Sequence, residues 1–230
     1  MKIFNAKNYG SIPHLPGSHL TVGDYTLNAG QAKILTVKTR DKHDTVFVHE
    51  KLDGSNVGIY REGDIFHPVS RSGNMCVNSP LEQHRIFYEW VKDNCGLFLF
   101  LEDGERLVGE WLAQAHGTKY AINNNPFVAF DIMRGSTRAL QSELDSRIPS
   151  EIPRSKLLHS GQAITVDKAD KLLGEYGHHG ATETSEGVVY RVERNGGVDF
   201  LGKYVRSGVV PGKYLRMDPP IWNWHPRKLN

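Results

Sequence analysis

The chain has 230 residues, of which 39% are hydrophobic and 23% charged, as expected for one large globular domain or one domain with a small appendage. The net charge of +2 does not by itself indicate a nucleic-acid partner, and the basic stretch from Lys203 to Lys228 fits a solvated surface as well as a phosphate-binding one. Cys76 and Cys95 indicate neither a disulfide framework nor a zinc site. Without a long apolar run or a signal-peptide pattern, we expect a cytoplasmic protein.

The first half of the chain combines strand patterns with one amphipathic helix. Its opening, through Gly30, is rich in Gly, Pro and His and predicts a loosely structured lead-in. Ser79-Pro80 has the pattern of an N-cap followed by a first-turn proline. The helix that it opens should bury Ile86, Phe87, Trp90 and Val91. The expected elements are a short helix over 31–37, strands over 45–50 and 57–60, and a helix over 81–94.

The second half adds strands in the same irregular alternation. Asp167 and Gly177 have the residue types of a helix N-cap and C-cap, and Asn195-Gly196 is a strong hairpin turn. His178-His179 lacks a suitably spaced third ligand, which predicts a loop with one buried imidazole. Without a regular βαβ repeat, the mixture favours an α+β domain built on antiparallel sheets. The expected elements are strands over 106–111, 127–133, 187–193 and 198–205, and a helix over 167–176.

Lys51-Leu52-Asp53-Gly54 places a lysine between the end of one predicted strand and a glycine turn. A lysine in this position can be a nucleophile if its amine loses a proton, because a free lysine is almost fully protonated at neutral pH. Five further segments carry charged or aromatic residues of the kind that a lysine nucleophile would need around it. They are Ser70-Arg71-Ser72-Gly73, Gly109-Glu110-Trp111, Phe130-Asp131-Ile132, Glu186-Gly187-Val188-Val189-Tyr190, and Lys203 within Phe200–Tyr204.

In this order, the segments resemble the motifs of the covalent nucleotidyltransferase superfamily, which comprises ATP-dependent DNA and RNA ligases and mRNA capping enzymes. The resemblance runs from residue 51 to residue 203, and the segments are most similar to those of stand-alone RNA ligase domains. Each match is weak by itself, and the specificity lies in their common order. The resemblance implies an α+β adenylyltransferase (ATP-grasp-like) domain of antiparallel sheets flanked by helices.

The resemblance also implies the reaction. Lys51 would attack the α-phosphorus of ATP and form a lysyl-AMP. The AMP would then pass to a 5′-phosphate end, and a 3′-hydroxyl would displace it to seal the strand. Phosphoryl transfer depends mainly on positioning and charge neutralisation. We expect Lys203 and a bound Mg²⁺ (or Mn²⁺) to lower the pKa of Lys51 by repulsion, since like charges disfavour the ammonium form.

Roles for single residues follow from the same resemblance. Lys51 and Lys203 would be catalytic, with Lys203 on the α-phosphate. Arg71 would bind a phosphate or the nucleic-acid end, and the carbonyl of Glu50 would accept from adenine N6. Glu110 would bind the ribose hydroxyls. Phe130 would stack on adenine, with Phe127 as a rival for that role. The metal shell would comprise Asp53, Glu110 and Glu186, although Asp53 fits a turn carboxylate equally well.

One departure concerns the last motif, where the family usually carries two lysines two residues apart. Leu201 and Val205 occupy that spacing around Lys203, so Arg206 or Lys213 is left as a candidate for the second role. Only 27 residues follow Lys203, too few for an OB barrel, and we therefore expect residues 1–230 to form a single nucleotidyltransferase domain.

The predicted partner is RNA with 5′-phosphate and 3′-hydroxyl ends. A nicked duplex, a broken tRNA loop and single-stranded ends all stay open as substrates. A minimal ATP-dependent DNA ligase is the main alternative. The second alternative is a non-catalytic module of the same fold that binds nucleic-acid ends.

Overall fold

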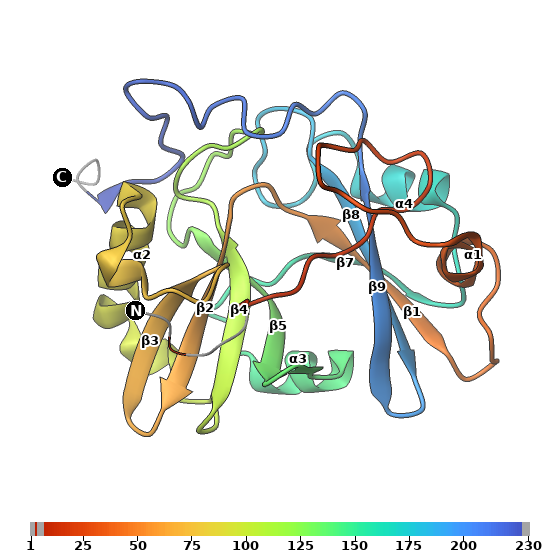
Figure 1. The fold of residues 1–230 in the computed structure, drawn as a ribbon, viewed down its shortest axis with the longest axis horizontal. Coiled ribbons are helices and arrows are strands. Elements are labelled where there is room, and N and C mark those ends of the chain that lie inside the picture. The colour runs from red at the N-terminus through yellow and green to blue at the C-terminus, as the bar shows by residue number, and fades with distance from the viewer. Residues whose placement is uncertain (1–2, 4–6, 227–230) are drawn as a thin grey trace.

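The computed structural model describes residue 3 and residues 7–226, and they fold around two antiparallel sheets that stand side by side (Figure 1). One sheet has the strand order β3-β2-β4-β5-β6 and the other β7-β1-β8-β9. The strands are β1 Thr45–Lys51, β2 Ser55–Glu62, β3 Ile65–Ser70, β4 Glu105–Trp111, β5 Phe127–Arg134, β6 Thr137–Arg138, β7 Leu157–Gly161, β8 Gly187–Arg194 and β9 Gly197–Val205. The predicted α+β class is confirmed.

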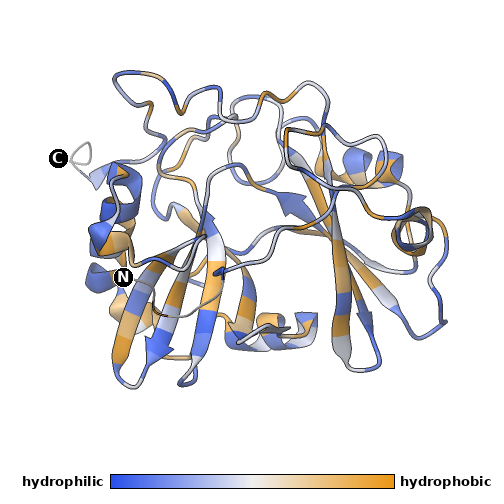
Figure 2. Ribbon diagram, viewed as in Figure 1, coloured by the Kyte–Doolittle hydropathy of each residue, from blue (hydrophilic) through white to orange (hydrophobic). Residues whose placement is uncertain are grey.

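Each sheet packs its outer face against helices, as Figure 1 shows with α2 beside β3 and with α1 and α4 beside β1 and β8. The helices are α1 Ala29–Thr36, α2 Glu82–Asp93, α3 Gln141–Arg147 and α4 Val166–Leu173. Two separate cores result, and Figure 2 shows the apolar bands that the strands contribute to them. The inner faces of the sheets meet through Tyr9, Val108, Met133 and Leu201. This arrangement leaves the strand ends above that contact to line a cleft.

Helix α2 buries Phe87, Trp90 and Val91 as predicted, whereas Ile86 is only partly buried. The predicted N-cap of this helix is wrong. Leu81 is the N-cap, and Ser79 lies outside the helix in an extended conformation. The reason is that the Ser79 hydroxyl bonds to the ring of His84 while it accepts from the amide of Leu81.

Both predicted caps of α4 were also wrong. Thr165 is the N-cap, and its side chain accepts from the amide of Lys168, so Asp167 falls within the first turn. The helix ends at Leu173 because Gly174, with φ of 70°, takes the left-handed conformation that closes the last turn. The Asn195-Gly196 hairpin is confirmed, since both residues have positive φ.

The prediction missed three edge strands, β3, β6 and β7, and one helix. β3 contains Pro68, β6 has only two residues, and β7 is only partly buried, so none has the clean alternation of an inner strand. The helix α3 is short and polar.

The lead-in through Gly30 is irregular but not loose, which corrects the expectation. Leu15 and Leu27 are buried, and the backbone of Leu15 donates to the carbonyl of Lys203 at 2.7 Å. Lys203 in turn donates to the carbonyl of Pro13 at 2.9 Å. The segment therefore runs along β9, because the edge of that strand offers unpaired backbone groups.

Among the described residues, no helix combines the length and hydropathy that crossing a membrane requires. Arg227 and Lys228 of the basic C-terminal stretch lie outside the described residues.

Candidate active site

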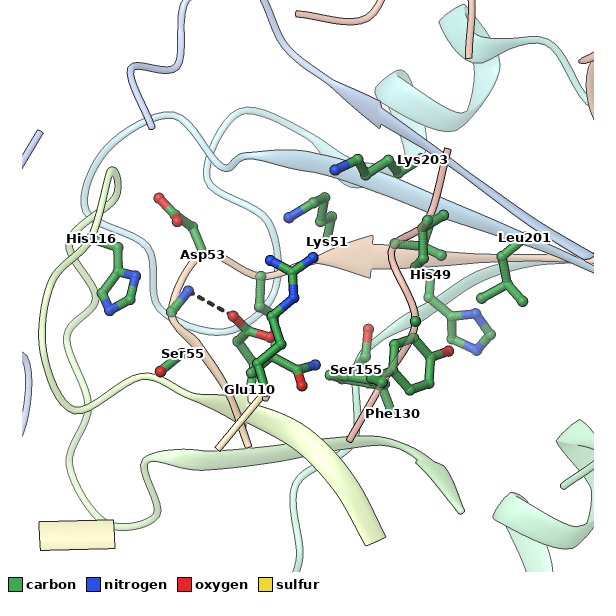
Figure 3. Close-up of a pocket in the computed structure, with 18 of the residues that line it drawn as sticks. His49, Lys51, Asp53, Ser55, Glu110, His116, Phe130, Ser155, Leu201 and Lys203 are labelled. Atoms are coloured by element: carbon green, nitrogen blue, oxygen red, sulfur yellow. Dashed lines mark hydrogen bonds between the residues drawn. The ribbon is translucent and has the colours of Figure 1, made fainter. Parts of the chain in front are cut away.

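A pocket of about 780 Å³ opens between the two sheets (Figure 3). Its volume is that of a site for a nucleotide-sized ligand. The lining comes from the strand ends of both sheets and from the N-terminal segment. Most of the residues singled out in the sequence line it, namely Glu50, Lys51, Asp53, Arg71, Glu110, Phe130 and Lys203.

Glu186 joins this group through Lys51. Lys51 is the last residue of β1 and pairs with Gly187, the first residue of β8, so Glu186 lies directly beside it. The Nζ of Lys51 lies 2.5 Å from Oε2 of Glu186, and both side chains are largely buried. Antiparallel pairing thus brings together two motifs that are 135 residues apart.

The electrostatics of Lys51 differ from the expectation. Burial disfavours the charged amine, yet attraction by Glu186, Glu110 and Asp53 outweighs burial and raises the pKa of Lys51. It is the pKa of Lys203 that is lowered, through burial and repulsion by Lys51, against the attraction of Asp24. Repulsion by Lys203 therefore does not suffice to lower the pKa of Lys51 against the three carboxylates, contrary to the expectation.

Burial disfavours the ionised form of two carboxylates around Lys51, those of Glu110 and Glu186. Burial raises the pKa of Glu110 to about 8 and that of Glu186 to about 7, although Lys51 acts in the opposite direction on both. The backbone amide of Gly54 donates to Oε1 of Glu110 at 3.1 Å, which fixes that carboxyl against the turn after Lys51.

The Asp53 carboxylate bonds to a distant loop and not to the backbone of its own turn. Its Oδ2 accepts from the amide of Gly117 at 2.7 Å, and its own amide donates to the hydroxyl of Tyr120 at 3.0 Å. No three acidic, histidine or cysteine residues of the described chain form a direct metal-ligand cluster. The donor set nevertheless suits a hydrated divalent cation, because Mg²⁺ prefers oxygen ligands and keeps several waters. A cation there would also offset the carboxylate charge that burial disfavours.

The two candidate aromatic residues lie in different places. Phe130 is half-buried, lines the pocket and meets the ring of Tyr9 edge to face at 5.1 Å. Phe127 is fully buried in the core against Phe87 and Trp90. Phe130 is therefore the aromatic residue of the pocket, and Phe127 is a packing residue.

Glu50 is among the lining residues of the pocket, and its carboxylate is fully buried. The carbonyl oxygen of Glu50 accepts from the hydroxyl of Ser155 at 2.7 Å. The carboxylate accepts from the amide of His178 at 3.0 Å and lies 2.8 Å from Nδ1 of His179. The predicted loop is confirmed, but neither imidazole is fully buried: His178 is exposed and His179 partly buried.

Arg71 lies at the rim of the pocket, exposed, and its guanidinium donates to the hydroxyl of Ser11 at 3.1 Å. Neither candidate for the second lysine role lines the pocket. Arg206 donates to Asp170 at 2.7 Å and to the hydroxyl of Ser185 at 2.8 Å, which ties α4 to the loop before β8. Lys213 pairs with Glu183 at 3.1 Å.

Sequence reasoning missed three histidines of the pocket: His49, His84 and His116. Burial lowers the pKa of each, to about 4 for His49 and His84, so the rings are neutral at pH 7. The helical spacing of His84 to Phe87 and Val91 places it on the buried face, and this signal was available. No local pattern identifies His116, because the loop that carries it is positioned by Asp53.

Comparison with known proteins gives a consistent result. The sequence model of the RNA ligase family matches residues 44–205, more than half of the chain. No curated protein matches.

Among solved structures, a variant of the Naegleria gruberi RNA ligase with ATP and Mn superposes with a TM-score of 0.52 at 17% identity, over 72% of this chain and 51% of that one. A second variant of the same ligase, with AMP and Mn, gives 0.51 at 16% identity, over 84% and 59%. The likeness shows a shared fold, and the chain spans little more than half the length of these structures.

Proposed function

The chain belongs to the RNA ligase family, and we propose on this basis that it is an ATP-dependent RNA ligase that acts through Lys51. The substrates are ATP, an RNA end with a 5′-phosphate and an RNA end with a 3′-hydroxyl. Residues 1–230 act as one nucleotidyltransferase domain, since every residue that lines the pocket lies between Lys7 and Lys203. A cytoplasmic location is a prediction from the sequence alone.

The observation that supports this proposal best is the position of the Lys51 amine. It lies against Glu186 in a pocket with a half-buried aromatic ring, Phe130, at one end. In the first step, Nζ of Lys51 forms a bond to the α-phosphorus of ATP, and the bond from that phosphorus to the pyrophosphate oxygen breaks. The amine must first lose a proton, and Oε2 of Glu186, 2.5 Å away, is placed to accept it.

The other pocket residues bind and orient the nucleotide. Phe130 packs on the adenine ring, and Glu110 accepts from ribose hydroxyls through the oxygen that Gly54 does not occupy. Lys203 contacts the α-phosphate, where a cation stabilises the charge of the transition state.

Asp53, Glu110 and Glu186 would hold a hydrated Mg²⁺ or Mn²⁺. When bound, such an ion supplies positive charge against the phosphates.

In the second step, a 5′-phosphate oxygen of the RNA attacks the phosphorus of the lysyl-AMP, and the N–P bond to Lys51 breaks. The amine regains a proton, and the RNA carries a 5′-linked AMP. In the third step, the 3′-oxygen of the other end attacks the 5′-phosphorus and AMP leaves. Lys51 is thus covalently involved only in the first two steps.

The test is the intact mass of the purified protein after incubation with ATP and Mg²⁺. The expected result is an added AMP that maps to Lys51, is absent in Lys51→Arg and is discharged by 5′-phosphorylated RNA. Lys92→Arg, at an exposed lysine, is the matched control. Labelling that survives in Lys51→Ala contradicts the proposal. Binding of RNA ends without any AMP adduct indicates the non-catalytic module instead.

A further inference from the structure

A second group of polar side chains lies in the pocket, across Lys51 from Phe130. Figure 3 shows Asp53, Ser55 and His116 at one end of the pocket and Phe130, with His49 and Leu201, at the other. Lys51 and Glu110 lie between the two ends (Figure 3). If the base of ATP occupies the Phe130 end, the Ser55 end is free to receive the group that reacts next.

Ser55 is held in place by a histidine. Its Oγ lies 2.9 Å from Nε2 of His84, and Nδ1 of that ring lies 2.8 Å from Oγ of Ser79. The His84 ring therefore sits between two hydroxyls. A neutral imidazole has one donor and one acceptor nitrogen. The hydrogen bond to His84 therefore fixes the Ser55 hydroxyl, which can still donate or accept toward the pocket.

His116 adds a hydrogen-bond acceptor beside Ser55 and His84. Its Nε2 lies 3.3 Å from Oε1 of Gln83, an amide oxygen that can only accept, so Nε2 carries the proton. The neutral ring then presents Nδ1 as an acceptor. The loop that carries His116 is fixed through the bond from Gly117 to Asp53.

The chemistry of this end suits hydroxyl groups better than phosphate. Ser55, His84 and His116 offer hydroxyl and imidazole groups without a lysine or arginine among them. Resting on the proposed ligase function, we propose that these three residues form a subsite for the hydroxyls of the 3′-terminal ribose of the strand to be joined. Ser55 and His116 contact the ribose, and His84 positions Ser55.

The subsite predicts which strand end is accepted. In sealing, the 3′-oxygen bonds to the 5′-phosphorus of the adenylylated end, AMP leaves and the hydroxyl proton is released. The 2′-hydroxyl stays bound to the subsite while the 3′-oxygen reacts. A 2′-deoxyribose end leaves one polar group of the subsite without a partner, which should slow sealing by about tenfold.

The experiment measures sealing of a pre-adenylylated RNA donor on a complementary strand, with acceptors that end in ribose or in 2′-deoxyribose. The wild type should seal the ribose end about tenfold faster. In Ser55→Ala and in His116→Ala, this preference should fall to about one because the ribose end loses rate. His84→Ala should lower the preference as well, since Ser55 then lacks its anchor. His43→Ala, at an exposed histidine, is the matched control.

Four results would overturn the subsite. The wild type could fail to seal the pre-adenylylated donor, or could seal both acceptors equally fast. The variants could instead lose rate equally on both acceptors, which indicates a structural role, or raise the KM for ATP in self-adenylylation as much as they slow sealing. A donor that already carries AMP bypasses the attack by Lys51, so failure of self-adenylylation in the wild type counts against the proposed function and not against the subsite.

Discussion

Lys51 and Glu186 form an ion pair across the start of the β1–β8 pairing, with 2.5 Å between Nζ and Oε2. The pair holds the amine in one position, and its attraction raises the pKa of Lys51 and so favours the protonated amine. Positioning and activation of this lysine are therefore separate problems. The carboxylates that place the amine also oppose its reactivity until a ligand changes the local charge.

Glu186→Gln should lower the pKa of Lys51, because the attraction of Glu186 is the largest of the effects that raise it. The measurement is an NMR titration of the lysine side chains, with Lys51 assigned from the Lys51→Arg spectrum. Glu183→Gln removes a carboxylate that pairs with Lys213 and should leave the Lys51 titration in place. An unchanged Lys51 titration in Glu186→Gln would show that burial, and not this ion pair, governs the amine.

Glu110 should make the protein less stable as the pH rises. Its pKa is about 8 in the fold, against an ordinary value of 4.5, so the folded state binds the extra proton between these values. Stability from this group is present below pH 4.5 and is lost as the pH rises to 8. The increase in melting temperature that Glu110→Gln causes should therefore be larger at pH 8.5 than at pH 5. Each kcal/mol of unfolding free energy corresponds to about 2–4 °C. Equal pH profiles for the two proteins would contradict this.

The two phenylalanines should separate stability from nucleotide binding. Phe127→Ala should cost about 3–5 kcal/mol of unfolding free energy, because the ring is fully buried against Phe87 and Trp90. Phe130→Ala should cost less stability and raise the KM for ATP by about tenfold through loss of the stacking surface. Urea unfolding and self-adenylylation kinetics measure the two effects. If Phe127→Ala raised the KM for ATP more than Phe130→Ala does, Phe127 and not Phe130 would be the residue that stacks on adenine.

Gly54→Ala should disrupt the turn after Lys51. A Cβ at this position would lie 2.5 Å from the carbonyl oxygen of Trp111, and backbone cannot move aside as a flexible side chain can. The expected loss is about 1–3 kcal/mol of stability together with most of the adenylylation activity. Gly96→Ala is the matched control, since nothing lies within 4 Å of an added Cβ there. Thermal melts and AMP labelling test both variants, and a wild-type result for Gly54→Ala would refute the close approach.

Substitution of Arg206 should affect stability, whereas substitution of Lys203 should affect the rate of AMP transfer to Lys51. Arg206→Met removes the bonds to Asp170 and Ser185 and should cost about 2 kcal/mol of stability, since hydrogen bonds to charged groups are lost. Lys203→Met should change stability little and slow AMP transfer to Lys51 by about 100-fold. Denaturant unfolding and single-turnover labelling separate the two. A stable Arg206→Met protein with slow labelling would assign the second phosphate contact to Arg206.

Strong local signals were sufficient for most of the elements. The alternating apolar residues predicted β1, and the Asn195-Gly196 turn predicted the hairpin of β8 and β9, because these patterns depend on adjacent residues. The caps of α2 and α4 were wrong because Ser79 bonds to a histidine side chain and Gly174 ends α4 before Gly177 is reached. Such choices depend on which competing partner lies nearest.

The sequence by itself determined the set of chemical groups and their order, since a motif is a run of neighbours along the chain. Only the tertiary structure decided how these groups act on one another. Burial selected Phe130 over Phe127 for the pocket, and strand pairing placed Glu186 against Lys51 and so set the charge of the nucleophile. The same long-range packing brought His84 and His116 into the pocket, because distance and burial in three dimensions have no counterpart in local sequence.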